Sequence, residues 1–161
     1  MSPCCYRFVG GTLAAMLLGA AAAETQAPWG RSSAPPIGYQ PQKVVYDVAA
    51  HDVDAFARVL DRVSYLNNLY EADPFRTSIV LVLHGDEIPF FAVANFRKYQ
   101  ELMVRAQSLT VGETIHFRMC GAAARERGLE AEDIHGFVEW VPMADAEIVR
   151  LQREEGYAYM R

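Results

Sequence analysis

The chain is short of cysteine. Only three cysteines occur in its 161 residues, and two of them, Cys4 and Cys5, lie at the extreme N-terminus. Cys120 stands alone in the rest of the chain, so no C-x-x-C pair is available for a dithiol redox cycle. If the N-terminus is removed, an intramolecular disulfide is excluded as well. A lone thiol in an oxidising compartment is buried, paired with another molecule, or reactive.

Several motifs of common function classes are also missing. The sequence has no G-x-G-x-x-G after its first strand and no G-x-x-x-x-G-K-[ST], so no motif supports nucleotide binding. It has no G-x-S-x-G of a serine hydrolase. The net charge is −5 and no basic run occurs, which argues against nucleic acid as a partner. No histidine has the spacing of a zinc or copper ligand set, so we expect neither a metal nor a cofactor.

Residues 1–23 have the pattern of a secretory signal peptide. Arg7 precedes an apolar run of small residues that ends in Ala21-Ala22-Ala23 before Glu24. The run is short and rich in glycine and alanine, which favours a cleaved signal over the alternative, a retained N-terminal anchor. We therefore expect an exported protein, periplasmic or secreted, with no membrane span in its mature form.

Two further regions follow the signal. Residues 24–42 are rich in proline, serine and glycine, which is typical of a flexible leader without a core of its own. Residues 43–161 form a stretch of roughly 120 residues, the size of one domain.

Apolar runs and helical periodicity alternate along this domain. The segment 52–72 repeats apolar residues at helical spacing, with Asp52 or Asp54 suited to the first turn and Pro74 beyond its end. Strands separated by helices require right-handed crossovers and a parallel sheet. The pattern predicts an α/β fold: a three-layer sandwich with a mostly parallel β-sheet of about five strands and helices on both faces, similar to flavodoxin. The expected strands are 43–49, 77–86, 113–120, 137–142 and 157–160. The expected helices are 51–72, 87–109, 121–128 and 143–156, and 129–136 is a polar connector that is also suited to a helix.

Cys120 is the first candidate site residue. It ends the third expected strand and precedes a helix, and the carboxyl ends of strands are where open α/β sheets bind ligands. The free N–H groups of a helix N-terminus stabilise an anion, and Arg118 alternates onto the same side of the strand. Gly121 lets a substrate or another backbone come close. These features favour a nucleophilic thiolate, whereas a small buried residue is the alternative, because free cysteines are often buried.

His84 is the second candidate, at the end of the second strand. It is suited to donate or accept a proton near Cys120, or else to cap the strand end as a structural residue. Asp86 either orients His84 or caps the following helix. His116 alternates onto the side of Arg118, so that side faces an opening or a subunit interface. The two remaining histidines are expected in solvent-exposed loops: His51 and His135.

Four stretches together resemble the DsrE/DsrF-like family of small sulfur-handling proteins: "VVYDV", "IVLVLHGDEIPFF", "IHFRMCGAAARERGL" and "VEWVPMADAEIVRLQREEGYAYMR". The resemblance covers most of residues 43–161 and implies a DsrE-like α/β sandwich that assembles into homo- or hetero-oligomers, often trimers or hexamers. It also implies that the matching cysteine, Cys120, accepts a sulfur atom as a persulfide and passes it on. The export signal departs from the cytoplasmic setting of the family, so the sulfur donor and acceptor would be periplasmic small molecules or carrier proteins.

The sequence leaves two principal hypotheses for function. The first is an exported sulfur carrier, in which Cys120 is the nucleophile, Arg118 stabilises its thiolate and His84 transfers a proton. The second is a non-catalytic oligomeric binding or assembly module in which Cys120 is merely packed. A flavodoxin-like cofactor binder is a third reading that has only the fold to support it.

Overall fold

The computed structural model describes residues 27–161, so the expected signal peptide lies outside the described residues. Contacts divide the chain into a unit that ends at Pro36 and a compact unit, Ile37–Arg161. The first strand begins at Gln42, one residue before the expected domain boundary. Among the described residues, no helix is long and apolar enough to cross a membrane.

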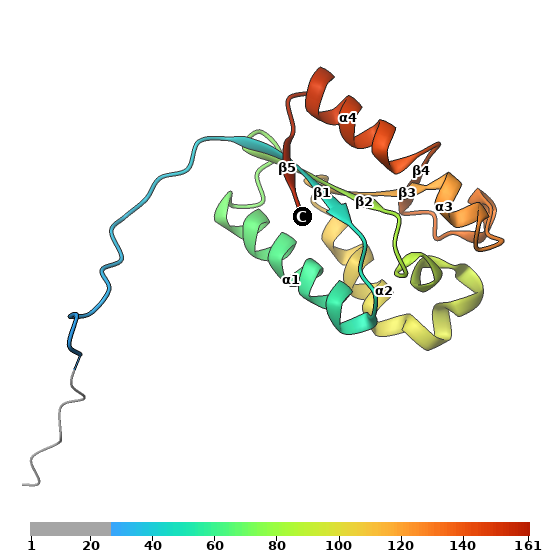
Figure 1. Ribbon diagram of the computed structural model, residues 1–161, viewed down its shortest axis with the longest axis horizontal. Helices are drawn as coiled ribbons and strands as arrows, with labels where there is room; N and C mark the ends of the chain where they lie inside the picture. Colours follow the sequence, from blue (N-terminus) through green and yellow to red (C-terminus); the bar gives the residue numbers. More distant parts are fainter. Residues whose placement is uncertain (1–26) are drawn as a thin grey trace, which may run out of the picture. The chain divides into compact units, whose positions relative to one another are not determined.

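Five parallel strands form one sheet in the order β4-β3-β2-β1-β5 (Figure 1). The chain steps from β1 to β4 in one direction, and α4 then returns it to the opposite edge. The strands are β1 Gln42–Val48, β2 Thr77–Leu83, β3 Ile115–Cys120, β4 Val138–Val141 and β5 Ala158–Met160, and the α-helices are α1 Val53–Leu69, α2 Phe96–Thr110, α3 Gly121–Arg125 and α4 Ala144–Glu154.

The sheet is covered on both faces, which confirms the predicted three-layer sandwich. Helices α1 and α2 pack on one face and α4 on the other, as Figure 1 shows. Strand residues alternate between two buried clusters. The larger cluster lies under α1 and α2, and the smaller one lies under α4 and includes Val45, Val82 and Cys120.

Helix α1 shows why the periodicity was informative. The Oδ1 atom of Asp52 accepts a hydrogen bond from the backbone N–H of Ala55 at 2.6 Å, which caps the helix as predicted. Phe56, Leu60 and Val63 are fully buried against the sheet.

The expected single helix over 87–109 is wrong in its first third. Two short 3-10 helices, Ile88–Phe91 and Val93–Asn95, precede α2 and are separated by Ala92 in an extended conformation. Pro89 lies in the first turn and Phe91 is fully buried among other aromatic rings. The segment is apolar because it fills the core at the carboxyl end of β2, and not because it forms a continuous helical face.

Candidate functional site

Cys120 lies under the N-terminus of α4. It is the last residue of β3 and its side chain is only 4% exposed. Its Sγ atom accepts a hydrogen bond from the backbone N–H of Ala144, the first residue of α4, at 3.2 Å. The first N–H groups of a helix have no partner inside the helix, so the sulfur satisfies one of them.

The donor to the sulfur therefore belongs to a different helix from the one expected. The helix that follows Cys120 directly is α3, and the thiol makes no capping bond to it. Cys120 pairs in register with Val141, which places the β4–α4 turn beside the end of β3. A second bond, from the N–H of Ala122 to the carbonyl oxygen of Pro142 at 3.1 Å, joins the same two junctions. The sequence could not indicate this contact, because it requires β3 and β4 to be neighbours.

Gly121 does make room, but for a side chain of this chain. A Cβ atom at Gly121 would lie 2.5 Å from Nε1 of Trp140. The indole therefore occupies the space that the sequence suggested for a substrate or another backbone. The guanidinium of Arg125 lies over the same indole, 5.4 Å from the ring centroid of Trp140, in a cation–π contact.

Arg118 lies on the Cys120 side of β3, as strand alternation predicts. Its Nε atom donates to Oε2 of Glu139 at 2.8 Å, and its Nη1 atom donates to Oε1 of Glu147 on α4. The Glu147 pKa is lowered, chiefly by the hydrogen bond from Arg150 and also by Arg118. Arg118 is thus bound to two carboxylates, and its role towards the Cys120 thiolate stays a prediction.

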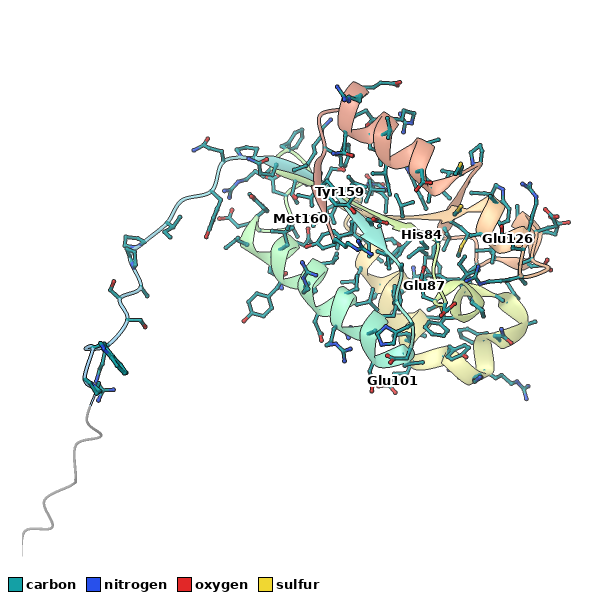
Figure 2. The ribbon with its side chains drawn as sticks, in the orientation of Figure 1. His84, Glu87, Glu101, Glu126, Tyr159 and Met160 are labelled. Carbon is teal, nitrogen blue, oxygen red and sulfur yellow. The ribbon has the colours of Figure 1, made fainter. Side chains whose placement is uncertain are left out.

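His84 is held by a residue that the sequence did not single out. Its Nε2 atom lies 2.5 Å from Oδ1 of Asp47 on β1, and the hydroxyl of Tyr159 on β5 donates to Oδ2 of the same carboxylate at 2.5 Å. His84 and Tyr159 are labelled in Figure 2, and they reach the Asp47 carboxylate from the two sides of β1. Asp86, which was expected either to orient His84 or to cap the following helix, instead pairs with Arg127 at 3.1 Å.

The Asp47 carboxyl is ionised at neutral pH. Burial would raise its pKa, but the hydrogen bonds from Tyr159 and His84, together with the charge of Arg161, bring the pKa below its ordinary value. The only signal for Asp47 in the sequence is a charged residue directly after the apolar run Val44-Val45-Tyr46.

A fully buried carboxyl group joins the ends of β1 and β2. The Glu87 side chain accepts hydrogen bonds from the N–H of Gly85 and the N–H of Ala50, both at 2.8 Å. Burial raises the Glu87 pKa, and these N–H donors only partly oppose the rise. Gly85 has no room for a side chain, because its Cβ would lie 2.6 Å from Cα of Ala49.

His84 and Cys120 occupy corresponding positions on adjacent strands. Leu83 pairs with Met119 in the β2–β3 ladder, so His84 and Cys120 come next in register. Alternation directs both side chains to the α4 face, where Val82 and Cys120 already lie. Within residues 27–161, no hydrogen bond joins the two side chains.

The other histidines lie apart from this site. His51 is exposed, as expected. His135 lies in a loop as expected, but the expected exposure is wrong: it is half-buried, stacks on Phe137 and meets the ring of Phe96 edge to face. Burial lowers its pKa. Across residues 27–161 no three His, Cys, Asp or Glu side chains are grouped so that they could hold a metal ion.

Comparison with known proteins adds information on the fold. No protein-family model matches the chain, and no curated protein matches it either. A solved structure that is similar is that of MTH1491 from Methanobacterium thermoautotrophicum, described as a protein of unknown function. The TM-score is 0.53 at 23% identity, over 74% of this chain and 98% of that one. This likeness supports the α/β fold alone, so the DsrE/DsrF-like resemblance stays a prediction.

Proposed function

We propose that this domain is a sulfur carrier that holds sulfane sulfur as a persulfide on Cys120. The observation that carries the proposal is the hydrogen bond from the Ala144 N–H at the start of α4 to the Cys120 sulfur. A helix N-terminus stabilises negative charge on the group that it contacts, and both the thiolate and the persulfide are anions. His84, one strand away on the same face, is the nearest candidate for proton transfer.

The proposed chemistry is thiol–persulfide exchange. The Cys120 thiolate attacks the outer sulfur of a donor R–S–SH, the S–S bond of the donor breaks, and R–S⁻ leaves with the bonding electrons. Cys120 is then a persulfide, and no external oxidant or reductant is needed. An acceptor thiolate attacks the outer sulfur of this persulfide in the same way and regenerates the Cys120 thiolate.

A second function is favoured by the burial of the sulfur. Cys120 is 4% exposed and belongs, with Val82 and Ile148, to the apolar cluster under α4. A cysteine in such a place can serve as a small apolar residue of an assembly module. The two functions differ in one measurable property, the reactivity of the Cys120 thiol in the folded protein.

The deciding experiment is intact-mass spectrometry after exposure to polysulfide or thiosulfate. The wild type and Cys120→Ser are compared with and without a reductant, and iodoacetamide alkylation is measured in parallel. The carrier predicts a gain of one or more sulfur atoms that a reductant removes and that Cys120→Ser lacks. A folded wild type that reacts with iodoacetamide and gains no sulfur would exclude sulfur transfer. A folded wild type that reacts with neither reagent would support the assembly module.

The proposed setting is outside the cytoplasm, in the periplasm of a Gram-negative host, with small-molecule or carrier-protein sulfur donors and a homo-oligomeric assembly. N-terminal sequencing of the protein from the periplasmic fraction tests the setting, and Glu24 is the expected first residue. Sedimentation of the same sample tests the assembly.

A further inference from the structure

A hydrogen-bonded cluster of three side chains lies beside the contact between Cys120 and the N-terminus of α4. Asp47 on β1, Tyr159 on β5 and His84, which directly follows β2, meet on the α4 face of the sheet. The side chains of His84 and Asp47 are 29% and 21% exposed, so the contact is partly shielded from water. A bond between a carboxylate and an imidazole in such a place either ties strands together or orients the imidazole.

The charge state of Asp47 decides which ring nitrogen of His84 carries the proton. An ionised carboxylate only accepts hydrogen bonds, so the 2.5 Å contact requires a proton on Nε2 of His84. In the neutral imidazole the other nitrogen, Nδ1, then has a free lone pair. The tautomer that accepts a proton at Nδ1 is therefore the one that Asp47 selects.

The sheet topology places Asp47, which binds Nε2 of His84, and Cys120 on opposite sides of β2. Strand β2 lies between β1, which carries Asp47, and β3, which carries Cys120. Neighbouring strands are about 4.8 Å apart, and His84 and Cys120 are next in register on the same face. A nucleophile, a base and a third group that orients the base thus follow one another across three adjacent strands.

Two further contacts hold this arrangement. Tyr159 occupies the second oxygen of Asp47, which leaves Oδ1 for His84. The buried Glu87 side chain binds the N–H groups of Gly85 and Ala50 and so fixes the ends of β2 and β1 relative to each other. Preorganisation of this kind is what a proton-transfer group needs.

We infer that Asp47 is the positioning residue of His84, and that together they remove the proton from the Cys120 thiol; this inference rests on the proposed function. The thiol proton moves to Nδ1 of His84, and the thiolate attacks the donor sulfur. The leaving R–S⁻ takes that proton from the imidazolium, so His84 returns to its neutral form. Asp47 stays ionised throughout and stabilises the imidazolium.

The test measures the reaction of Cys120 with iodoacetamide and with polysulfide as a function of pH, in the purified protein. The variant is Asp47→Asn. Asp61→Asn is the matched control, since it removes the same charge from an exposed pair between Asp61 on α1 and Arg105 on α2. Tyr159→Phe is a second variant that leaves the bond from Asp47 to His84 in place. The ionisable groups that surround His84, and that the profile therefore reports, are Asp47, Glu87, Cys120, Tyr159 and Arg161.

We expect Asp47→Asn to slow both reactions at neutral pH by roughly tenfold or more, which is less than the roughly 100-fold or more that a general base itself contributes, because His84 stays in place. The rates should converge with the wild type at high pH, where the thiolate forms without a base. Tyr159→Phe should show a smaller loss with the same pH dependence. In a His84→Gln background, Asp47→Asn should cause no further loss, because its effect acts through His84.

Three results would overturn the inference. The first is a pH–rate profile of Asp47→Asn that coincides with that of Asp61→Asn. The second is a loss of rate in Asp47→Asn that is equal at every pH. The third is that Asp47→Asn slows the reaction as much in the His84→Gln background as it does in the wild type. If Asp47→Asn does not fold, a pH–rate profile of Tyr159→Phe that is identical to that of the wild type would also overturn the inference. The proposed function fails separately, if no sulfur is gained while the alkylation profile still depends on Asp47.

Discussion

Glycine follows each of the two residues that carry the proposed chemistry. Gly85 follows His84, and Gly121 follows Cys120. Neither has a positive φ angle, so neither is required by backbone conformation. Each is required because a neighbour leaves no room for a Cβ atom: the backbone of Ala49 at Gly85, and the indole of Trp140 at Gly121. The chain therefore comes closest to its neighbours at both strand ends of the candidate site.

Gly121→Ala should destabilise the fold. The new Cβ would lie 2.5 Å from Nε1 of Trp140, so the half-buried indole must move. Overpacking of this kind costs about 1–3 kcal/mol, more than alanine gains over glycine in a helix. Urea unfolding followed by tryptophan fluorescence measures the loss. Gly136→Ala is the control, since no atom lies within 4 Å of its Cβ, and equal midpoints for the two variants would contradict the prediction.

At this scale the sequence indicated side chains at strand ends but not their partners. His84 was found because it follows an apolar run at the carboxyl end of a strand, and Cys120 because it ends an alternating strand just before a helix. Asp47 was missed because a charged residue near the end of a short strand is usually solvated. The contribution of the Ala144 N–H was missed because every residue except proline has a backbone N–H, so the residue type does not reveal it.

At the scale of elements, the spacing of apolar residues predicted a helix correctly where the helix packs with one face only. Helices α1 and α4 bury one stripe each, and their bounds lie close to the expected ones. The expected helix failed over 88–95, because four nearly consecutive residues, Ile88, Phe90, Phe91 and Ala92, are buried while Val93 is exposed, so the apolar residues do not follow a single helical face. The aromatic rings there pack on Phe56 and Phe117, which no local pattern reveals.

The link between β1 and β2 through Glu87 predicts a pH dependence of stability. The Glu87 pKa is raised in the folded state, so the folded protein binds more protons than the unfolded one just above the ordinary value of 4.5. Stability is therefore lost as the pH rises from that value through the folded pKa. Asp47 does not interfere, since its lowered pKa keeps it ionised in both states over this range.

Glu87→Gln removes the titration and should reduce this dependence. The amide keeps one acceptor oxygen for the N–H of Gly85 or Ala50 and carries no charge. We expect the variant to be less stable than the wild type near pH 4.5 and to recover part of that difference at higher pH. Urea unfolding at several pH values measures the difference. A difference that stays constant or widens with pH would show that the carboxyl group is not penalised by burial.

At the scale of the molecule, the alternation of strands and helices was enough to predict a parallel three-layer sandwich. The strand order β4-β3-β2-β1-β5 was not predictable in the same way. Several orders satisfy right-handed crossovers, and the choice among them depends on which strands bury which faces. The candidate site depends on this order, because it makes Asp47, His84 and Cys120 neighbours.

The same topology predicts that residues before Ile37 are dispensable for folding. The buried apolar residues of the described part all lie between Val44 and Tyr157, and residues 27–41 are exposed throughout. A protein that begins at Ile37 should therefore have the same melting temperature as one that begins at Glu24, by calorimetry at matched concentration. Both should also sediment alike and gain sulfur on Cys120 at the same rate, since the site draws on no residue before β1. A lower melting temperature that depends on concentration would instead show that residues 24–36 contribute to an interface between copies.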